Sequence, residues 1–373
     1  MRVLFDSQIF CHQRFGGISR YVTNVALEMW RNGYATPLIV APVHFNQYAG
    51  ELPKNLVHGR RVRWLEHAGP LAFGTGYIPG RIAARRFHPD VVHNTYYAPT
   101  NPVPGTPGII TVHDMIHERL PYDVSSAALI ARWKERCISR ASRVICISES
   151  TRHDLLNTYE IPEERISVIH LGHTALASSA IQGVATDVRD RAPTPPIPYI
   201  LHVGDRARYK NFSALRDAYA SSAWLRGNFA LVCFGGGKFT PLEKLSIREA
   251  GLDNRVLHVS GDDAALANYY RHAAMFVCPS KYEGFGLPPL EAMSLDCPVA
   301  CSNTSSLPEV VGNAAEMFDP TDTEAIRNAL ERVLSSNERR MDLVAKGRVQ
   351  QLKFSWTECA RKTAEVYRIA LNV

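Results

Sequence analysis

Short apolar runs alternate with longer segments of helical periodicity along this chain, and the alternation occurs in two series. The first series of apolar runs comprises Val3–Phe5, Pro37–Ala41, Val91–His93, Gly108–His113, Arg143–Ile147 and Ile166–His170. The second comprises Tyr199–Gly204, Ala230–Phe234, Val256–Val259, Met275–Pro279 and Pro298–Cys301. Strands that alternate with helices build parallel sheets from βαβ units. The sequence therefore predicts an α/β protein with two doubly wound sheets.

A proline-rich segment separates the two series. It ends in Ala-Pro-Thr-Pro-Pro-Ile-Pro at positions 192–198, and proline cannot donate the N–H that a regular element needs. We therefore predict an N-terminal domain over 1–175, a linker over 176–198 and a C-terminal domain over 199–355. Apolar residues at helical spacing after Ser355 predict a terminal helix over about 356–373. The length of 373 residues fits two domains that each bury a core.

Composition excludes several classes of protein. Lys and Arg number 42 against 36 Asp and Glu, a mild excess that fits an anionic ligand or membrane surface but does not by itself indicate nucleic acid. The eight cysteines include no C-x-x-C pair, which favours reduced, buried thiols in a cytoplasmic protein over disulfides or a metal site. The N-terminus is expected to be a first strand rather than a signal peptide, and no apolar stretch is long enough to span a membrane.

The segment with the most chemistry follows the apolar run Met275–Pro279 and opens a helix. It reads Ser-Lys-Tyr-Glu-Gly-Phe-Gly-Leu-Pro-Pro-Leu-Glu at positions 280–291. Gly284 and Gly286 allow a sharp turn and a close approach of a ligand to the backbone, and a helix N-terminus attracts anions. Glu283 and Glu291 would instead accept hydrogen bonds from hydroxyl groups. A ligand with both phosphates and hydroxyls, such as a nucleotide sugar, satisfies both demands, whereas a glycine turn with no ligand is the simpler alternative.

This segment resembles the signature of the retaining GT-B glycosyltransferases of family 4, in which two Glu separated by seven residues surround Gly-Phe-Gly. The resemblance implies two Rossmann-like domains that face each other across a cleft, with the terminal helix crossing back to the first domain. It also implies that Glu283 contacts the donor sugar and that Glu291 binds the ribose hydroxyls. Further donor-binding residues implied in the same segment are Gly284, Phe285, Gly286 and Leu287.

A basic loop follows the first strand after the linker. It runs from Gly204 to Phe212 and contains cations at the carboxyl end of a strand, where a diphosphate can be held. The family usually has Arg-Lys-Asn here, and this chain has Tyr209 in place of that Arg. By resemblance, Lys210 neutralises the donor diphosphate. Arg206 and Arg208 both lie close enough in sequence to supply the second cation, and we expect Arg206 to do so, while a solvated basic loop remains the alternative.

Two motifs in the first half also match the family. Gly16-Gly17-Ile-Ser-Arg-Tyr opens a predicted helix, and the resemblance implies that Gly17 touches the donor. His113 and Asp114 close a strand, at the edge of a parallel sheet where catalytic groups gather. By resemblance, His113 contacts the sugar or the acceptor and transfers a proton, and Asp114 orients His113. Each motif taken alone has a purely structural alternative.

Three lesser segments complete the set. Val259 and Ser260 end a predicted strand, and the resemblance implies that this region packs on the nucleotide base. Cations interleaved with apolar residues suit an anionic membrane surface or a phosphorylated lipid acceptor, with a plain solvated face as the alternative. They occur at Arg60–Trp64 and at Arg81, Arg85 and Arg86.

The resemblance as a whole implies a hexosyltransferase that acts in surface polysaccharide synthesis, most like bacterial mannosyltransferases. The expected donor is GDP-mannose, with UDP-sugars as the second choice, and the expected acceptor is a glycan or a lipid-linked glycan. No metal or other cofactor is expected, because fixed cations would stabilise the departing diphosphate. The expected location is the cytoplasm or the inner face of the membrane. The alternatives are a sugar-nucleotide epimerase of the same architecture and a non-catalytic nucleotide-sugar-binding module.

Overall fold

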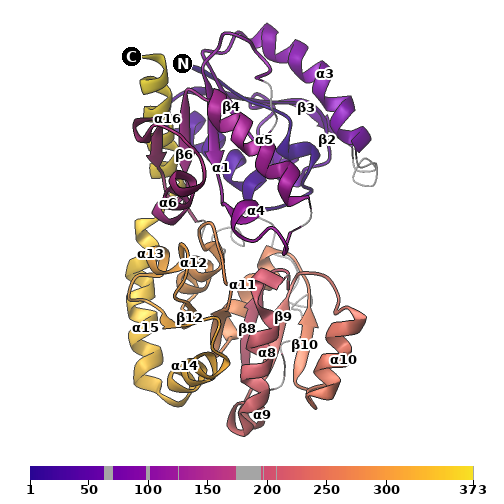
Figure 1. Cartoon of the computed structure of the whole chain (residues 1–373), viewed down its shortest axis with the longest axis vertical. Coiled ribbons are helices and arrows are strands. Elements are labelled where there is room, and N and C mark those ends of the chain that lie inside the picture. The colour runs from indigo at the N-terminus through magenta and orange to yellow at the C-terminus, as the bar shows by residue number, and fades with distance from the viewer. Residues whose placement is uncertain are drawn as a thin grey trace. The chain divides into compact units, whose positions relative to one another are not determined.

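The structure is a computed structural model, and it describes residues 1–62, 70–97, 101–124, 126–173, 195, 197–206 and 208–372. The chain forms two compact units (Figure 1). Unit 1 comprises Met1–Gly172 together with Ser355–Val373, and unit 2 comprises His173–Phe354. Most of the predicted linker, 176–198, lies outside the described residues.

Unit 1 is built on a parallel sheet of seven strands in the order β3-β2-β1-β4-β5-β6-β7. The central strands β1, β4 and β5 are almost wholly buried, as parallel strands covered on both faces must be. The seven strands are Arg2–Phe5 (β1), Thr36–His44 (β2), Val57–Arg61 (β3), Val91–Asn94 (β4), Gly108–Val112 (β5), Arg143–Cys146 (β6) and Ile166–Val168 (β7).

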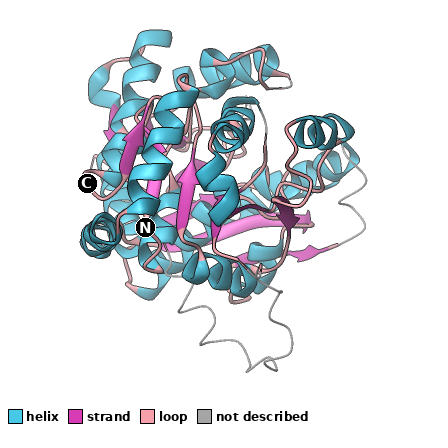
Figure 2. Ribbon diagram, turned by 90° about the horizontal axis from the view of Figure 1, so that it is seen from below, coloured by secondary structure: helices cyan, strands magenta, loops and turns pink. Residues whose placement is uncertain are grey.

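Helices cover the strands of this sheet (Figure 2). Both α1 and α3 pack on β2. The chain moves along the sheet in one direction through α1 and returns through α3, so right-handed crossovers place these two helices on opposite faces. The helices of unit 1 are Gly17–Arg31 (α1), Gln47–Glu51 (α2), Pro70–Phe87 (α3), Ile116–Arg119 (α4), Ala127–Arg140 (α5), Glu149–Thr158 (α6) and Trp356–Leu371 (α16).

The last helix, α16, belongs to unit 1, where it packs against α1 and β6 (Figure 1). Ser355 caps it, since the Ser355 hydroxyl accepts a hydrogen bond from the Glu358 N–H at 3.1 Å. Gly172 lies so close to the start of the helix that a Cβ at this position would be 2.1 Å from the Trp356 backbone nitrogen. The chain therefore meets the helix at a point where only glycine fits.

Unit 2 contains a parallel sheet of six strands in the order β10-β9-β8-β11-β12-β13. The strands are Tyr199–Val203 (β8), Ala230–Phe234 (β9), Val256–Val259 (β10), Met275–Cys278 (β11), Val299–Ser302 (β12) and Glu316–Phe318 (β13). The helices are Phe212–Ser221 (α8), Ala223–Asn228 (α9), Pro241–Glu249 (α10), Asp263–His272 (α11), Leu287–Ser294 (α12), Leu307–Val311 (α13), Thr323–Ser335 (α14) and Asn337–Gln350 (α15). Short 3-10 turns occur at Ile9–Cys11, Glu163–Arg165, Arg208–Lys210 and Gln351–Lys353.

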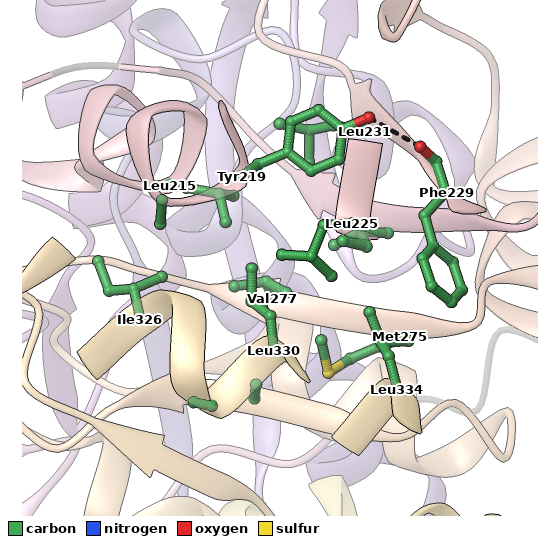
Figure 3. Packing of buried hydrophobic residues seen from close by; sticks show 14 of the residues in the cluster. Leu215, Tyr219, Leu225, Phe229, Leu231, Met275, Val277, Ile326, Leu330 and Leu334 are labelled. Carbon is green, nitrogen blue, oxygen red and sulfur yellow. Dashed lines mark hydrogen bonds between the residues drawn. The ribbon is translucent and has the colours of Figure 1, made fainter. Parts of the chain in front are cut away.

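The core of unit 2 lies between this sheet and helices α8, α9 and α14 (Figure 3). Leu215 of α8, Leu225 of α9 and Met275 of the central strand β11 belong to this one cluster of buried residues. The Tyr219 hydroxyl donates a hydrogen bond to the Phe229 carbonyl at 2.7 Å, so the polar end of this buried ring is satisfied. This packing holds the strands firmly, and with them the loops at their carboxyl ends.

The predicted fold class is confirmed, since both halves are doubly wound parallel α/β units. The prediction missed the edge strands β3 and β13. Strand β3 is Val-His-Gly-Arg-Arg with three exposed residues in the middle, and β13 has only three residues. Neither contains an apolar run, because an edge strand buries less surface than a central one.

Candidate active site

The topological switch point of unit 2 lies between β8 and β11. From β8 the chain builds β9 and β10 on one side, and then β11, β12 and β13 on the other. Ligands of doubly wound sheets bind beyond the carboxyl ends of the strands at such a point. Lys210 follows β8 and Glu283 follows β11, and the Lys210 Nζ lies 2.8 Å from the Glu283 Oε1. Two predicted site residues, 73 positions apart, therefore meet at this switch point.

The surroundings of this ion pair fix both side chains. The Ser280 hydroxyl donates a second hydrogen bond to the Glu283 Oε1 at 2.6 Å. The Lys210 ammonium lies 5.3 Å from the centre of the Tyr209 ring, a cation–π distance. Burial opposes the charged form of Lys210, but the Glu283 carboxylate outweighs it and raises the pKa of the ammonium. The positively charged Lys210 side chain is thus fixed at the carboxyl ends of the strands.

The loop that carries Glu283 is held by two serines that the sequence analysis did not single out. The Glu283 N–H donates to the Ser305 hydroxyl at 2.9 Å. The buried Ser306 hydroxyl bonds the carbonyls of Glu283 and Phe285, at 2.8 and 2.6 Å. Ser305 and Ser306 follow β12, the next strand of the sheet, and no motif in the sequence links them to this loop.

Glycine is required at the end of this loop. Gly286 has φ +126°, and a Cβ there would lie 3.0 Å from the Leu307 side chain. Pro288 and Pro289 stand in the first turn of α12, where proline is favoured but brings no N–H. The helix start therefore offers fewer donors to an anion than the sequence analysis assumed.

Glu291 lies within α12 and is buried, with 7% of its surface exposed. The Tyr270 hydroxyl, on α11, donates to the Glu291 Oε2 at 3.4 Å. Burial, together with the nearby carboxylate, raises the pKa of Tyr270 well above its ordinary value, so the phenol stays a donor. The contact orients one oxygen of the carboxylate that was predicted to bind the ribose.

Arg206, the residue expected to be the second diphosphate cation, lies in an internal network. Its Nε lies 2.6 Å from the Glu243 Oε1, and its guanidinium donates to the carbonyls of Gly235, Gly237 and Lys238. Only 3% of its side chain is exposed. Arg208, by contrast, is exposed and has no ion-pair partner among the residues that the structure describes. The assignment of the second cation stays a prediction.

Arg206 ties the loop after β8 to the glycine loop after β9. A Cβ on Gly236, which has φ +67°, would lie 2.4 Å from the Gly204 carbonyl oxygen. The Gly235 N–H donates to the Val259 carbonyl at 2.9 Å, and Ser260 is exposed beside it. The residues predicted to face the base therefore lie at the same edge of the sheet as Lys210.

The predicted residues of unit 1 also lie at carboxyl ends of strands. Gly17 is the first residue of α1, is exposed and has open space where a Cβ would be. His113 directly follows β5 and is buried, with its ring edge-on to Tyr21 at 5.1 Å between centroids. No residue in the described part of the chain makes a hydrogen bond to the His113 ring.

Asp114 was expected to orient His113, and its carboxylate has other contacts. The Asp114 Oδ1 accepts a hydrogen bond from the Ile116 N–H at 3.1 Å and lies 3.9 Å from the His117 Nδ1. Asp114 therefore accepts from the first N–H of α4 and acts on His113 through its charge. Burial lowers the pKa of His113 to about 4 although Asp114 opposes this shift. The imidazole is neutral at pH 7.

Of the two basic segments, Arg60 and Arg61 lie on the edge strand β3, and Arg63 and Trp64 lie outside the described residues. In the ranges given above, His, Cys, Asp and Glu side chains nowhere form a group of three that could hold a metal ion. Within the same ranges no helix has the length and hydropathy needed to cross a lipid bilayer.

Two doubly wound units in one chain, with polar and charged side chains at the carboxyl ends of the strands, are the architecture of GT-B proteins. Comparison with known structures supports this fold. WaaG, a glycosyltransferase involved in lipopolysaccharide biosynthesis, superposes with a TM-score of 0.73 at 16% identity over 98% of this chain and 99% of that chain. Sucrose-phosphate synthase from Thermosynechococcus elongatus gives 0.73 at 19% identity, over 99% and 98%.

Sequence families cover most of the chain. The family described as Glycosyltransferase Family 4 matches residues 15–173, and Glycosyl transferases group 1 matches residues 188–350. The chain therefore belongs to the group 1, family 4 glycosyltransferases. It is 31% identical to O-antigen chain mannosyltransferase B of Escherichia coli over 62% of each protein. It is 28% identical to the MMP alpha-(1->4)-mannosyltransferase of Mycolicibacterium hassiacum, over 78% of this chain and 73% of that protein. The match to serotype-specific mannosyltransferase WbdA of Escherichia coli, at 31% identity, covers 61% of this chain and only 28% of WbdA.

Proposed function

We propose that this protein transfers mannose from GDP-mannose to a glycan or lipid-linked glycan acceptor, with retention of the anomeric configuration. The observation that carries the proposal is the Lys210–Glu283 pair at the switch point of unit 2, with Glu291 on the following helix. Mannose is favoured because relatives at 31% and 28% identity are named mannosyltransferases. UDP-sugars are the second choice, since a structural neighbour holds UDP-glucose.

Each group at the switch point has a task in this proposal. Lys210 neutralises the diphosphate, Glu291 accepts hydrogen bonds from the ribose hydroxyls, and Glu283 contacts the hydroxyls of the sugar. Negative charge develops on the diphosphate as the glycosidic bond breaks, and a cation fixed beside it stabilises that transition state. We propose that these fixed groups make a divalent ion unnecessary, so EDTA should leave the rate of transfer unchanged.

In unit 1, Gly17 is proposed to touch the donor, and the other tasks concern the acceptor. Neutral His113 has a free lone pair for the proton of an acceptor hydroxyl. The cations Arg81, Arg85 and Arg86 on α3, beside the exposed Ile82, suit the phosphates of a lipid-linked acceptor or of an anionic membrane. Flotation with vesicles that contain anionic lipid, compared with neutral vesicles, tests this surface, and equal recovery with both would reject it.

The direct test of the proposed function is transfer by the full chain. GDP-mannose and UDP-glucose are incubated with and without a panel of mannose-terminated, lipid-linked oligosaccharides, and the sugars are analysed. We expect a new mannoside only when GDP-mannose and an acceptor are both present. Conversion of the donor to an epimer without acceptor would indicate the epimerase, and binding of GDP without turnover on any acceptor would indicate a binding module. Either result contradicts the proposal.

We propose Arg208, in place of Arg206 as expected from the sequence, as the second cation, and a matched pair of variants tests this choice. Arg206 is enclosed by protein carbonyls and Glu243, whereas Arg208 is exposed on the same loop. We expect Arg208→Met to weaken GDP binding without a change in Tm. We expect Arg206→Met to lower Tm, because the two loops lose their common partner. If Arg208→Met leaves GDP binding unchanged, the second cation is not Arg208.

A further inference from the structure

Lys134, on α5, is a fully buried lysine at the base of the loop that carries His113. Its side chain has 0% exposure. The Lys134 Nζ donates to the Asp114 carbonyl at 2.9 Å and to the Glu118 Oε2 at 2.8 Å. The ring of Tyr97 lies 5.1 Å from the same nitrogen. The ammonium is thus surrounded by acceptors and an aromatic face, and one of those acceptors is the backbone carbonyl next to His113.

Packing alone does not explain a charge at this position. Burial of an ammonium and a carboxylate costs free energy that their attraction repays only in part, and apolar residues of the same volume often stabilise a core more. Both oxygens of the Glu118 carboxylate nevertheless have a hydrogen-bond donor, because the Tyr159 hydroxyl donates to the oxygen that Lys134 does not contact, at 2.6 Å. A buried, fully satisfied network of this kind specifies one arrangement of the chain around it.

We propose that Lys134 is a positioning residue for His113: its buried ammonium fixes the loop after β5 through the Asp114 carbonyl and acts on the imidazole through its charge. The inference rests on the proposed function, because His113 matters only if its imidazole meets the reacting groups. Glu118 and Tyr159 have the supporting task of keeping the ammonium in place.

Several titratable groups in the described part of unit 1 lie around His113. They are Asp114 on its own loop, Lys134 on α5, His93 on β4, and the phenols of Tyr21 on α1 and Tyr97 after β4. Burial is the main reason that the pKa of His113 is lowered; Asp114 acts against burial and Lys134 acts with it. Removal of the Lys134 charge should therefore raise the pKa of His113.

The test uses the full chain and a double variant, Lys134→Met with Glu118→Gln, which removes both charges and keeps an acceptor for Tyr159. Histidine NMR follows the titration of His113, assigned with the variant His113→Asn. We expect the pKa of His113 to rise by half a unit or more. We also expect kcat for transfer to fall at least tenfold with the KM for the donor unchanged. Arg136→Met is the matched control because it removes an exposed cation from the same helix, α5, and its kcat should stay within about twofold of the wild type.

A double variant that folds and retains the pKa of His113, kcat and the pH profile would reduce Lys134 to a structural residue and overturn the proposal. The wild type supplies a second test that needs no variant, since a His113 that titrates near the ordinary value of about 6.5 would equally overturn it. The NMR result stands apart from the proposed function: absence of transfer by the wild type would reject the transferase, while the pKa would still decide the effect of Lys134.

Discussion

Replacement of Glu283 by Gln should make the protein bind GDP more tightly while it transfers sugar more slowly. In the structure the Lys210 ammonium is bound to the Glu283 carboxylate at 2.8 Å. An incoming diphosphate must compete with that carboxylate for the same cation. Glutamine has nearly the same shape and still accepts the hydrogen bond from Ser280, so the variant removes the competing charge and little else.

The size of the effect follows from the geometry. Both side chains are mostly buried, with 20% of Lys210 and 15% of Glu283 exposed, so solvent screens the pair only weakly. A hydrogen bond to a charged group contributes about 1.5–3 kcal/mol, against about 0.5–1.5 kcal/mol for a neutral one. The difference of about 1–1.5 kcal/mol corresponds to a Kd for GDP that is lower by a factor of about 5 to 12.

Isothermal titration of GDP into the wild type and Glu283→Gln measures this factor. Glu316→Gln is the matched control, because Glu316 is a similarly buried partner of Arg332 and Arg339 on the edge strand β13, and its loss should leave the Kd unchanged. A Glu283→Gln protein that binds GDP equally well or more weakly would show that the diphosphate does not compete with this carboxylate.

Three further predictions concern stability. Gly172→Ala forces a Cβ to within 2.1 Å of the Trp356 nitrogen and should lower the free energy of unfolding, measured with urea, by about 1–3 kcal/mol. The control is Gly227→Ala in α9, where a Cβ has open space, and it should leave the free energy of unfolding unchanged or raise it by up to about 1 kcal/mol. Equal effects of the two substitutions would refute the reasoning. Gly236→Ala should destabilise unit 2 and weaken GDP binding together, and a change in only one would contradict the close approach to Gly204. Burial lowers the pKa values of four histidines, His44, His93, His113 and His202. The unfolded chain therefore binds protons below about pH 6.5 that the folded chain does not bind, and the free energy of unfolding should fall as pH drops from about 6.5 towards 4, by up to about 1.4 kcal/mol per pH unit per histidine. A free energy of unfolding that stays constant between about pH 7.5 and 5.5 would contradict this.

Sequence periodicity predicted the central strands of both sheets well because a strand that is buried on both faces must be continuously apolar. Strand Ala230–Phe234, which is buried throughout, was predicted with the bounds that the structure has. The edge strand Val256–Val259 was predicted as well, because three of its four residues are apolar. An edge strand such as Val57–Arg61 carries polar residues, so the search for apolar runs does not find it. The sequence predicted that Lys210 and Glu283 both lie at the carboxyl ends of strands, where ligands bind. Their direct contact depends on the order of the strands in the sheet, which no local sequence pattern encodes.

The supporting residues were beyond sequence reasoning for a different reason. Ser305, Ser306 and Tyr270 act through single hydrogen bonds from neighbouring elements, and a serine or tyrosine in such a place leaves no periodic signal. Lys134 looks like any solvent-facing lysine on a helix until its zero exposure is known. For Arg206 the sequence predicted a cation at the right strand end, and only the coordinates reveal that its donors are engaged by Glu243 and loop carbonyls.

The most direct test of the proposed donor site is a crystal structure of the full chain with GDP. The diphosphate should lie within hydrogen-bond distance of the Lys210 Nζ, and the ribose hydroxyls should contact the Glu291 carboxylate beyond the carboxyl ends of β8 and β11. A nucleotide bound elsewhere on the chain, or one whose ribose and phosphates avoid both side chains, would contradict the account.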